Sequence, residues 1–501
     1  MQMSFLELLK LASPEAVVVV TALVVLAIGV TTGREAGATP ATTETTSAIC
    51  SAVAALGLVV TVGAVLILPH NATLFGGMLV ITPLNSLFKI ICIALAFFTV
   101  LLARSDPASR NPGEYLAMLL LATIGLMLLV GSEEFLMIFI GLELTGLSLY
   151  VMAAFDKTDV RSAEAGLKYF LFGSTASAFT LFGISFIYGV SGTTSLAAIG
   201  QKLTTESVQP LLAVGIVMTL IGFAFKIAAA PFHLWAPDAY QGAPVPSAAF
   251  IASGSKVASF VVLGKIVLVG FAPMHGSADW HAMVAGWSPL LAALSALSIL
   301  LGNLVALAQT NVRRLLAYSA VAHAGYTLLG LVAGGRDGFS ATLFYTTVYA
   351  ITLVGAFGVV AVVRRVTGGD DFADFSGLWM HSPLLAGCMA VFMLSLAGIP
   401  PLAGFFGKFY LFSAALGAGT SHGLLWLVVV ALFGSLISLY YYLVVLKVIF
   451  VDSAPAETSL KSESYRIDLL QRGVIAVLAA AVLFLGIMPE TLAARIIASL
   501  P

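Results

Sequence analysis

The feature that most constrains this chain is a succession of apolar runs, each about 20 residues long and separated by short polar or Pro- and Gly-rich breaks. A helix needs about that length to cross the roughly 30 Å of hydrocarbon in a bilayer. Hydrophobic residues make up 60% of the 501 residues and charged residues 9%, against about 25% charged in soluble domains. The pattern predicts an all-α polytopic membrane protein.

The breaks between the runs predict about fourteen transmembrane helices. Two spans, 208–240 and 382–418, are too long for one crossing and contain prolines: Pro231 in the first, Pro400 and Pro401 in the second. Because proline removes a backbone donor, we expect a broken helix at each place. The fourteen spans lie near 14–32, 48–68, 82–104, 113–131, 133–155, 162–190, 208–240, 247–271, 283–307, 315–334, 339–363, 382–418, 422–448 and 470–492.

Broken helices at corresponding places in two halves are typical of inverted-repeat transporters, whose site lies near the membrane midplane. We therefore expect peripheral helices 1–3 in residues 1–112 and a first repeat of five helices in 113–271. A second repeat of five helices follows in 283–450, and a linker with the last helix in 451–501. Since five is an odd number of crossings, the second repeat must be inverted.

The distribution of Lys and Arg predicts the orientation. If the N-terminus faces outward, 13 basic residues lie on the inner side and 4 on the outer side, so both termini are expected outside. The inner residues are Arg34, Arg104, Arg110, Lys157, Arg161, Arg313, Arg314, Arg364, Arg365, Lys447, Lys461, Arg466 and Arg472; the outer ones are Lys10, Lys202, Arg336 and Arg495.

The remaining six basic residues lie within the spans, and all six are lysines: Lys89, Lys168, Lys226, Lys256, Lys265 and Lys408. A charge at mid-bilayer costs about 2.5–3.5 kcal/mol on insertion scales. A buried lysine can give up its proton, whereas arginine cannot. This selection of lysine favours proton transfer over structural pairing.

Depth separates these lysines. Lys89 and Lys265 lie within about two turns of the outer interface and are expected to extend to it. Lys226 and Lys256 lie near the centres of their spans. Lys168 is about 10 Å in from the inner surface, and Lys408 lies beyond the second break, toward the outside.

The one acid deep in a span is Glu143. A static salt-bridge network is the alternative to proton transfer. It accounts for Glu143 with one lysine, but it leaves the other deep lysines without a buried acid, which static networks avoid.

Two histidines are also candidates. His233 follows Pro231 in the first break, and His323 lies in mid-span; histidine titrates near neutral pH and has two ring nitrogens. His323 is equally explained as a packing residue. Because the carbonyl that Pro231 leaves unbonded must be satisfied by protein groups or water, we expect a wet cavity beside Lys226 and His233.

Cofactor chemistry in this chain is not expected. Cys50, Cys92 and Cys388 are far apart, and there is neither a CxxC pair nor a Gly-rich phosphate loop. The net charge of −1 gives no indication of nucleic-acid binding.

Glu143, Lys168, Lys226, Lys256 and Lys408, with the stretches "KIAAAPFHLWAPDAY", "RRLLAYSAVAHAGY" and "GIPPLAGFFGKFYLF", resemble the antiporter-like subunits of respiratory complex I. The resemblance covers nearly the whole chain and is closest to the N-type subunit of bacterial NADH:quinone oxidoreductase. The M type usually has glutamate at the position of Lys408. The L type has a long lateral helix after its last spans, where this chain stops at Pro501.

The resemblance implies that Glu143 pairs with Lys168 and that His233 and His323 lie on a central hydrophilic axis. It implies a proton path from Lys226 through Lys256 and His323 to Lys408, coupled to quinone reduction elsewhere. NADH, FMN, iron–sulfur clusters and quinone would be held by other subunits of the complex. The partners would be neighbouring membrane subunits and the lipid bilayer, in the inner (plasma) membrane with both termini periplasmic. A subunit of a multi-subunit cation/proton antiporter and a membrane scaffold are the alternatives.

Overall fold

The computed structural model describes residues 5–33, 40–104, 106, 111–204, 209–418, 422–452 and 468–500. Four of the basic residues used to predict the orientation, Arg34, Arg110, Lys461 and Arg466, lie outside these ranges. Most of the predicted linker, residues 453–467, also lies outside them.

The described residues are mostly helical, and they include one short two-stranded hairpin. Within the described residues, twelve helical segments are long and apolar enough to cross a membrane. Two shorter apolar helices, Pro210–Lys226 and Pro383–Ala397, begin the two spans in which breaks were predicted. These fourteen segments match the predicted spans, so the prediction of a polytopic all-α membrane protein is confirmed.

The chain divides into two compact units. Unit 1 holds residues 1–226, 242–275 and 499–501, and unit 2 holds residues 227–241 and 276–498. The elements of unit 1 are α1 (Phe5–Leu11), α2 (Ser13–Gly33), α3 (Pro40–Ile67), β1 (Ala72–Leu74), η1 (Phe75–Gly77), β2 (Leu79–Ile81), α4 (Pro83–Ala103), α5 (Pro112–Gly131), α6 (Phe135–Ala153), α7 (Val160–Ser191), α8 (Leu196–Leu203), α9 (Pro210–Lys226), α11 (Val245–Ala252), α12 (Gly254–Lys265), the π-helix η2 (Ile266–Gly270) and η3 (Ala272–Met274).

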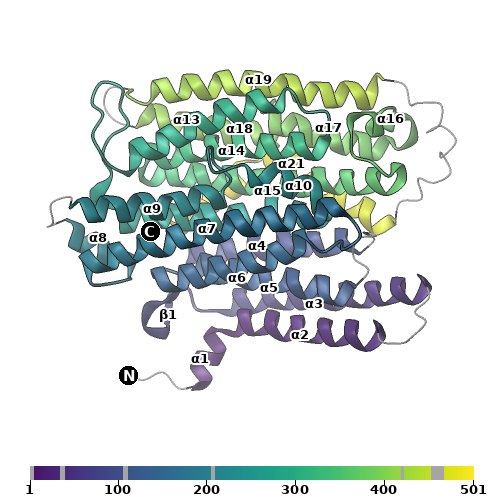
Figure 1. Ribbon diagram of the computed structural model, residues 1–501, viewed down its shortest axis with the longest axis horizontal. Coiled ribbons are helices and arrows are strands. Elements are labelled where there is room, and N and C mark those ends of the chain that lie inside the picture. The colour runs from purple at the N-terminus through teal and green to yellow at the C-terminus, as the bar shows by residue number, and fades with distance from the viewer. Residues whose placement is uncertain are drawn as a thin grey trace. The chain divides into compact units, whose positions relative to one another are not determined.

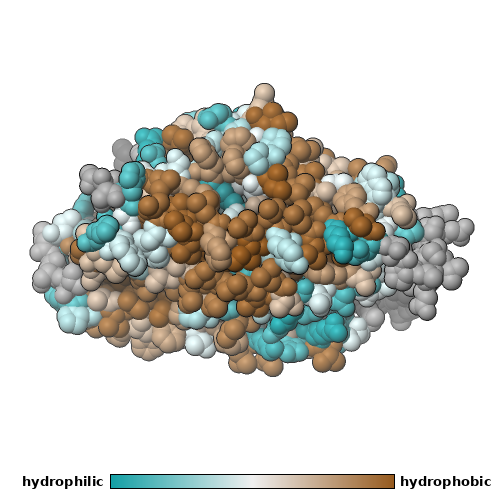
Figure 2. All heavy atoms as spheres, turned by 90° about the horizontal axis from the view of Figure 1, so that it is seen from above, coloured by the Kyte–Doolittle hydropathy of each residue, from teal (hydrophilic) through white to brown (hydrophobic). Residues whose placement is uncertain are grey.

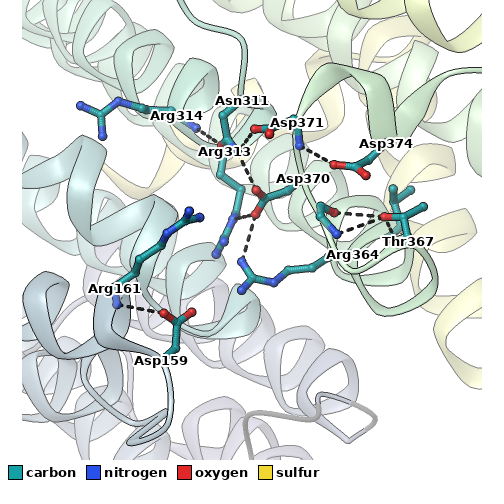
Figure 3. A network of polar contacts seen from close by, with 12 residues as sticks. Asp159, Arg161, Asn311, Arg313, Arg314, Arg364, Thr367, Asp370, Asp371 and Asp374 are labelled. Atoms are coloured by element: carbon teal, nitrogen blue, oxygen red, sulfur yellow. Dashed lines mark hydrogen bonds and ion pairs between the residues drawn. The ribbon is translucent and has the colours of Figure 1, made fainter.

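In unit 1 each of the long helices α2 to α7 packs on the next one along the chain, and α5 also packs on α2. These helices run side by side in Figure 1. Helices α2 and α5 approach closely at Gly29 and Gly113: a Cβ on Gly29 would lie 2.5 Å from the Cα of Gly113. Small residues permit this contact, which is how membrane helices gain packing energy without a hydrophobic driving force. Helix α7 starts after Asp159, whose side chain accepts a hydrogen bond from the Arg161 backbone nitrogen (Figure 3).

Unit 2 contains the second set of long helices. Helix α14 packs on α13 and α15, and both α14 and α15 are almost entirely buried. The elements are α10 (Trp235–Gly242, whose last residue falls in unit 1), α13 (Trp287–Ala306), α14 (Val312–Ala333), α15 (Gly335–Thr367), η4 (Phe372–Phe375), α16 (Leu378–His381), α17 (Pro383–Ala397), α18 (Ala403–Gly417), α19 (Leu425–Phe450), α21 (Leu469–Ile487) and α22 (Glu490–Ser499).

Both predicted helix breaks are present. Helix α9 ends at Lys226 and α10 begins at Trp235, with Pro231 between them. Helix α17 ends at Ala397 and α18 begins at Ala403, with Pro400 and Pro401 between them. In the first break, the Ala230 backbone nitrogen donates to the Ser298 hydroxyl of α13 at 2.8 Å, so protein groups satisfy part of the unwound backbone.

A buried charge network joins two connections at one end of unit 2 (Figure 3). The Asp370 carboxylate accepts hydrogen bonds from Arg313 and from Asn311, and its Oδ2 lies 3.0 Å from Nη1 of Arg364. The backbone nitrogen of Val312 donates to the Asp370 carbonyl at 2.9 Å. The network therefore ties the start of α14 to the segment that follows α15.

The surface is apolar where a bilayer would meet it. Helix α19 exposes Val429, Leu432, Phe433 and Leu436, each more than half accessible. Brown, apolar side chains dominate the face drawn in Figure 2. Exposed apolar patches of this extent indicate contact with lipid or with other membrane helices.

Candidate functional site

Lys226 occupies the C-terminal end of α9, directly before the first break, and its residue is 6% exposed. The carbonyl end of a helix carries a partial negative charge, which stabilises an ammonium group there. The Glu143 carboxylate adds a second attractive electrostatic interaction. Among the described residues, Lys226 makes no hydrogen bond or ion pair, and its role in proton transfer stays a prediction.

Glu143 lies on α6 and accepts a short hydrogen bond from the Ser177 hydroxyl of α7. Lys168, one helix on in the chain, forms an ion pair with Glu164 at 2.6 Å, four residues earlier on α7. Its side chain is 38% exposed. The pairing of Glu143 with Lys168 therefore stays a prediction.

Lys256 lies in the first turn of α12 and is 2% exposed. A backbone irregularity at Ser253 (φ −114°, ψ −81°) separates α12 from α11. The sequence contains no proline at this break; small residues surround it instead, and Gly254 allows Phe250 and Leu126 to approach.

The prediction that Lys89 and Lys265 extend to the membrane surface was wrong. Lys89 is 6% exposed and Lys265 is 5% exposed. Lys89 lies 2.6 Å from a carboxylate oxygen of Glu15, and Lys265 donates to Asn85 and to the Val130 carbonyl. Both lysines stay inside unit 1 because Glu15, Asn85 and the Val130 carbonyl accept hydrogen bonds from them there.

His323 of α14 is bonded through both ring nitrogens. Its Nε2 lies 3.1 Å from the Tyr442 hydroxyl of α19, and its Nδ1 lies 2.7 Å from the Tyr345 hydroxyl of α15. The Tyr442 hydroxyl also bonds to that of Ser319. A ring bonded on both sides can accept a proton at one nitrogen and release one from the other.

Lys408 lies in α18 and is 4% exposed. Its ammonium donates at 2.9 Å to the carbonyl of Ala397, the last residue of α17, and at 2.9 Å to the Ser435 hydroxyl of α19. The second break therefore supplies a backbone acceptor to this lysine. Gly398 has a positive φ of 86°, and a Cβ there would lie 2.9 Å from the Lys408 side chain, so the break needs glycine at this position.

Sequence reasoning missed the tyrosines near His323 and Lys408, of which Tyr326 contacts both: its ring lies 5.7 Å from that of His323. The Lys408 ammonium lies 5.2 Å from the centre of the Tyr326 ring, within the range of a cation–π contact. Asn303 donates to the Tyr326 hydroxyl at 3.0 Å and accepts from that of Tyr441 at 3.0 Å. The sequence could have indicated Tyr326, because it follows His323 by three residues and therefore lies on the same face of the helix.

His233 lies in the first break, in unit 2, and is 8% exposed. Its ring is 6.3 Å from that of Tyr318. Its Nδ1 is buried without a hydrogen-bond partner among the described residues, which is costly unless water or a proton donor reaches it. The wet cavity expected beside Pro231 stays a prediction.

Within the described part of the chain, no group of three or more His, Cys, Asp or Glu side chains could hold a metal ion. The arrangement consists instead of buried lysines, histidines and hydroxyls beside broken helices. Such a fold and site define a class of polytopic membrane proteins that move protons or ions across the bilayer.

The chain belongs to the NADH:quinone oxidoreductase/Mrp antiporter transmembrane family, whose sequence profile matches residues 132–438. It is 45% identical to "NADH-quinone oxidoreductase subunit N 2" of Acidobacterium capsulatum over 98% of both chains. The resemblance to antiporter-like subunits seen in the sequence is thereby confirmed.

Solved structures share the fold. A chain of "Respiratory complex I from Thermus thermophilus with bound Aureothin" is 30% identical and superimposes with a TM-score of 0.77, over 96% of this chain and 98% of that one. A chain of the Mrp complex from Dietzia sp. DQ12-45-1b is 21% identical, with a TM-score of 0.81 over 99% of this chain and 97% of that one. The latter shows the fold alone.

Proposed function

We propose that this chain is the N-type subunit of a bacterial NADH:quinone oxidoreductase and moves protons through the membrane arm. The observation that carries the proposal is the set of buried titratable groups beside both helix breaks. A relative named as a subunit N aligns with 98% of this chain, which supports the same conclusion. NADH, FMN, iron–sulfur clusters and quinone would be held by other subunits. This chain would supply the proton path.

The proposed path starts at Lys226, which is buried at the end of α9 and interacts electrostatically with Glu143. A change in the charge state of Glu143 and Lys168, driven by quinone reduction elsewhere in the complex, would alter the proton affinity of Lys226. The proton then passes through Lys256 and His323 to Lys408. Hydroxyls on both sides of His323 support a relay at that step.

The proposed location is the bacterial plasma membrane, with both chain termini on the outer side. The asymmetry of Lys and Arg between the two sides supports this orientation. His233, beside the first break, is proposed to exchange protons with water near Lys226.

The decisive variant is Lys226→Ala. We expect the complex to assemble but proton uptake in sealed vesicles to be abolished, with quinone reduction lowered because the two processes are coupled. Lys226→Arg should fail as well, since arginine keeps its proton. Normal pumping with alanine at position 226 would remove Lys226 from the path.

A subunit of a cation/proton antiporter is the alternative function, because the family includes both kinds of protein. Mass spectrometry of the native complex, purified through a tag on this chain, separates the two. Flavin and iron–sulfur subunits are expected to co-purify with an NADH:quinone oxidoreductase subunit. Their absence from an intact complex that contains other membrane subunits would favour the antiporter.

A further inference from the structure

A second group of charges in unit 1, built around two buried lysines, has no part in the proposed path. It contains two lysines, Lys89 of α4 and Lys265 at the end of α12, and two acids, Glu15 of α2 and Glu133 in the connection from α5 to α6. The charges balance. Because a buried ion is costly unless it is paired and hydrogen-bonded, the two buried lysines favour an arrangement of the helices that keeps these partners in place.

The Lys265 ammonium is surrounded by three acceptors from different elements. It donates to the Asn85 side-chain oxygen at 2.6 Å and to the Val130 carbonyl at 2.8 Å, and it lies 3.7 Å from a carboxylate oxygen of Glu133. An ammonium has three N–H donors and no acceptor. The site therefore matches the charged form, and loss of the proton would leave one acceptor without a donor.

Asn85 is itself fixed. Its side-chain nitrogen donates to the Val80 carbonyl of β2 at 2.7 Å, which turns its oxygen toward Lys265. One turn further along α4, Lys89 binds Glu15 at 2.6 Å and lies beside Gly131. The contacts thus join α2, α4, α5 and α12 near one end of the unit.

Helix α12 needs such an anchor because its backbone is irregular at both ends. It begins after the distorted Ser253 and passes into the π-helix η2 directly after Lys265. Lys256 lies nine residues before Lys265, about 13.5 Å along the same regular helix. A shift or rotation of α12 would therefore move Lys256 with it.

We propose that Lys265 is a positioning residue: its fixed charge holds α12 against α4 and α5 and thereby places Lys256 for proton transfer. This inference rests on the proposed function. It assigns opposite roles to two lysines of one helix, since Lys256 must release its proton and Lys265 must keep it.

The test compares Lys265→Met with Lys265→Arg in the whole complex, scored as proton pumping per assembled complex in sealed vesicles. Methionine removes the charge, and we expect pumping to fall about tenfold or more, because small misplacements of a reacting group have effects of that size. Arginine keeps the charge and its donors, and about half of the pumping or more should remain. Lys202→Met, at an exposed lysine of the same unit, is the control and should leave pumping unchanged.

A second readout separates positioning from mere loss of stability. The pH at which pumping is half-maximal should move in Lys265→Met, because the surroundings of Lys256 change, and should stay in place in Lys202→Met. A destabilised complex would lose subunits without moving this pH. Should Lys265→Met fail to assemble, Asn85→Ala removes one acceptor and is expected to lower pumping several-fold at normal subunit content.

Two results would overturn the positioning role. One is normal pumping in Lys265→Met, or in Asn85→Ala where that variant replaces it. The other is a loss in Lys265→Arg as deep as in Lys265→Met, because Lys265 would then act by releasing its proton. If the wild-type complex itself moves no protons, the proposed function fails instead, so the two failures are distinguishable.

Discussion

Tyr442 carries the hydroxyl that joins Ser319 to His323, and its residue is fully buried. Tyr442→Phe removes this hydroxyl with little change in volume. We expect pumping to fall, by up to about a hundredfold if the hydroxyl passes the proton to His323. The measurement is proton uptake per assembled complex in sealed vesicles.

Tyr440→Phe is the matched control for Tyr442→Phe, because Tyr440 lies on the same helix and is 64% exposed. It should pump as the wild type does. Equal activity of the two variants would mean that His323 acts without Tyr442, and that the contact between them serves packing.

The burial of Lys226, Lys256 and Lys408 could be predicted because each lies deep in an apolar run. The burial of Lys89 and Lys265 could not, because depth along a helix does not reveal what packs beside it. Glu15 accepts from Lys89 across 74 residues of the sequence, and Asn85 accepts from Lys265 across 180. The tyrosines around His323 were missed for a related reason: a buried tyrosine resembles any aromatic packing residue until its hydroxyl partner is known.

At the scale of elements, the prolines of the sequence predicted two helix breaks but gave no indication of the irregular backbone at the two ends of α12. Pro231, Pro400 and Pro401 each stand in a region that is not helical. The distortion at Ser253 and the π-helix after Lys265 have no proline to mark them. No proline-based pattern could have predicted either feature.

Helices α6 and α7 carry Glu143 and Lys168, proposed here as a switchable pair. A buried brace would be destabilised by about 3–5 kcal/mol on removal of either partner. Lys168, however, is 38% exposed and already paired with Glu164, so loss of its charge should be tolerated. We expect Glu143→Gln and Lys168→Ala each to reduce pumping while the complex assembles.

The double variant of Glu143 and Lys168 should lose little more than either single variant, as expected for residues that act as one unit. Pumping and subunit content are both scored for the four members of the cycle. Additive losses, or failure of a single variant to assemble, would count against the switch.

Asp370, in the segment that follows α15, is predicted to serve stability rather than pumping. It accepts from Arg313, which is 1% exposed, so Asp370→Asn leaves a buried guanidinium without its counter-charge. We expect a loss of about 3–5 kcal/mol in stability, seen as a lower unfolding temperature and less chain in the membrane. Asp374→Asn, in a more exposed part of the same loop, should cost far less. Equal stability of the two variants would show that the contacts of Asp370 with Arg313 and Arg364 in Figure 3 are not a brace.

At the scale of the whole molecule, helix α19 determines what a topology experiment should find. Its 26 residues span about 39 Å, enough to cross a bilayer. The Trp280 backbone nitrogen donates to the Gly423 carbonyl at 3.2 Å, so the loop that holds His281 lies near the start of α19. Asp452 follows its end. Residues 281 and 452 must therefore face opposite sides of the membrane.

The excess of basic residues on one side assigns those sides: His281 should be outside and Asp452 inside. We expect His281→Cys to react with a membrane-impermeant thiol reagent in intact cells. Asp452→Cys should react only in inverted vesicles. The native Cys50, Cys92 and Cys388 are buried and should give little background labelling. The reverse pattern would place both termini inside, and with them would reverse the direction assigned to Lys226 and Lys408. Labelling of both positions from one side would mean that α19 does not cross the membrane, which its length and its exposed apolar face argue against.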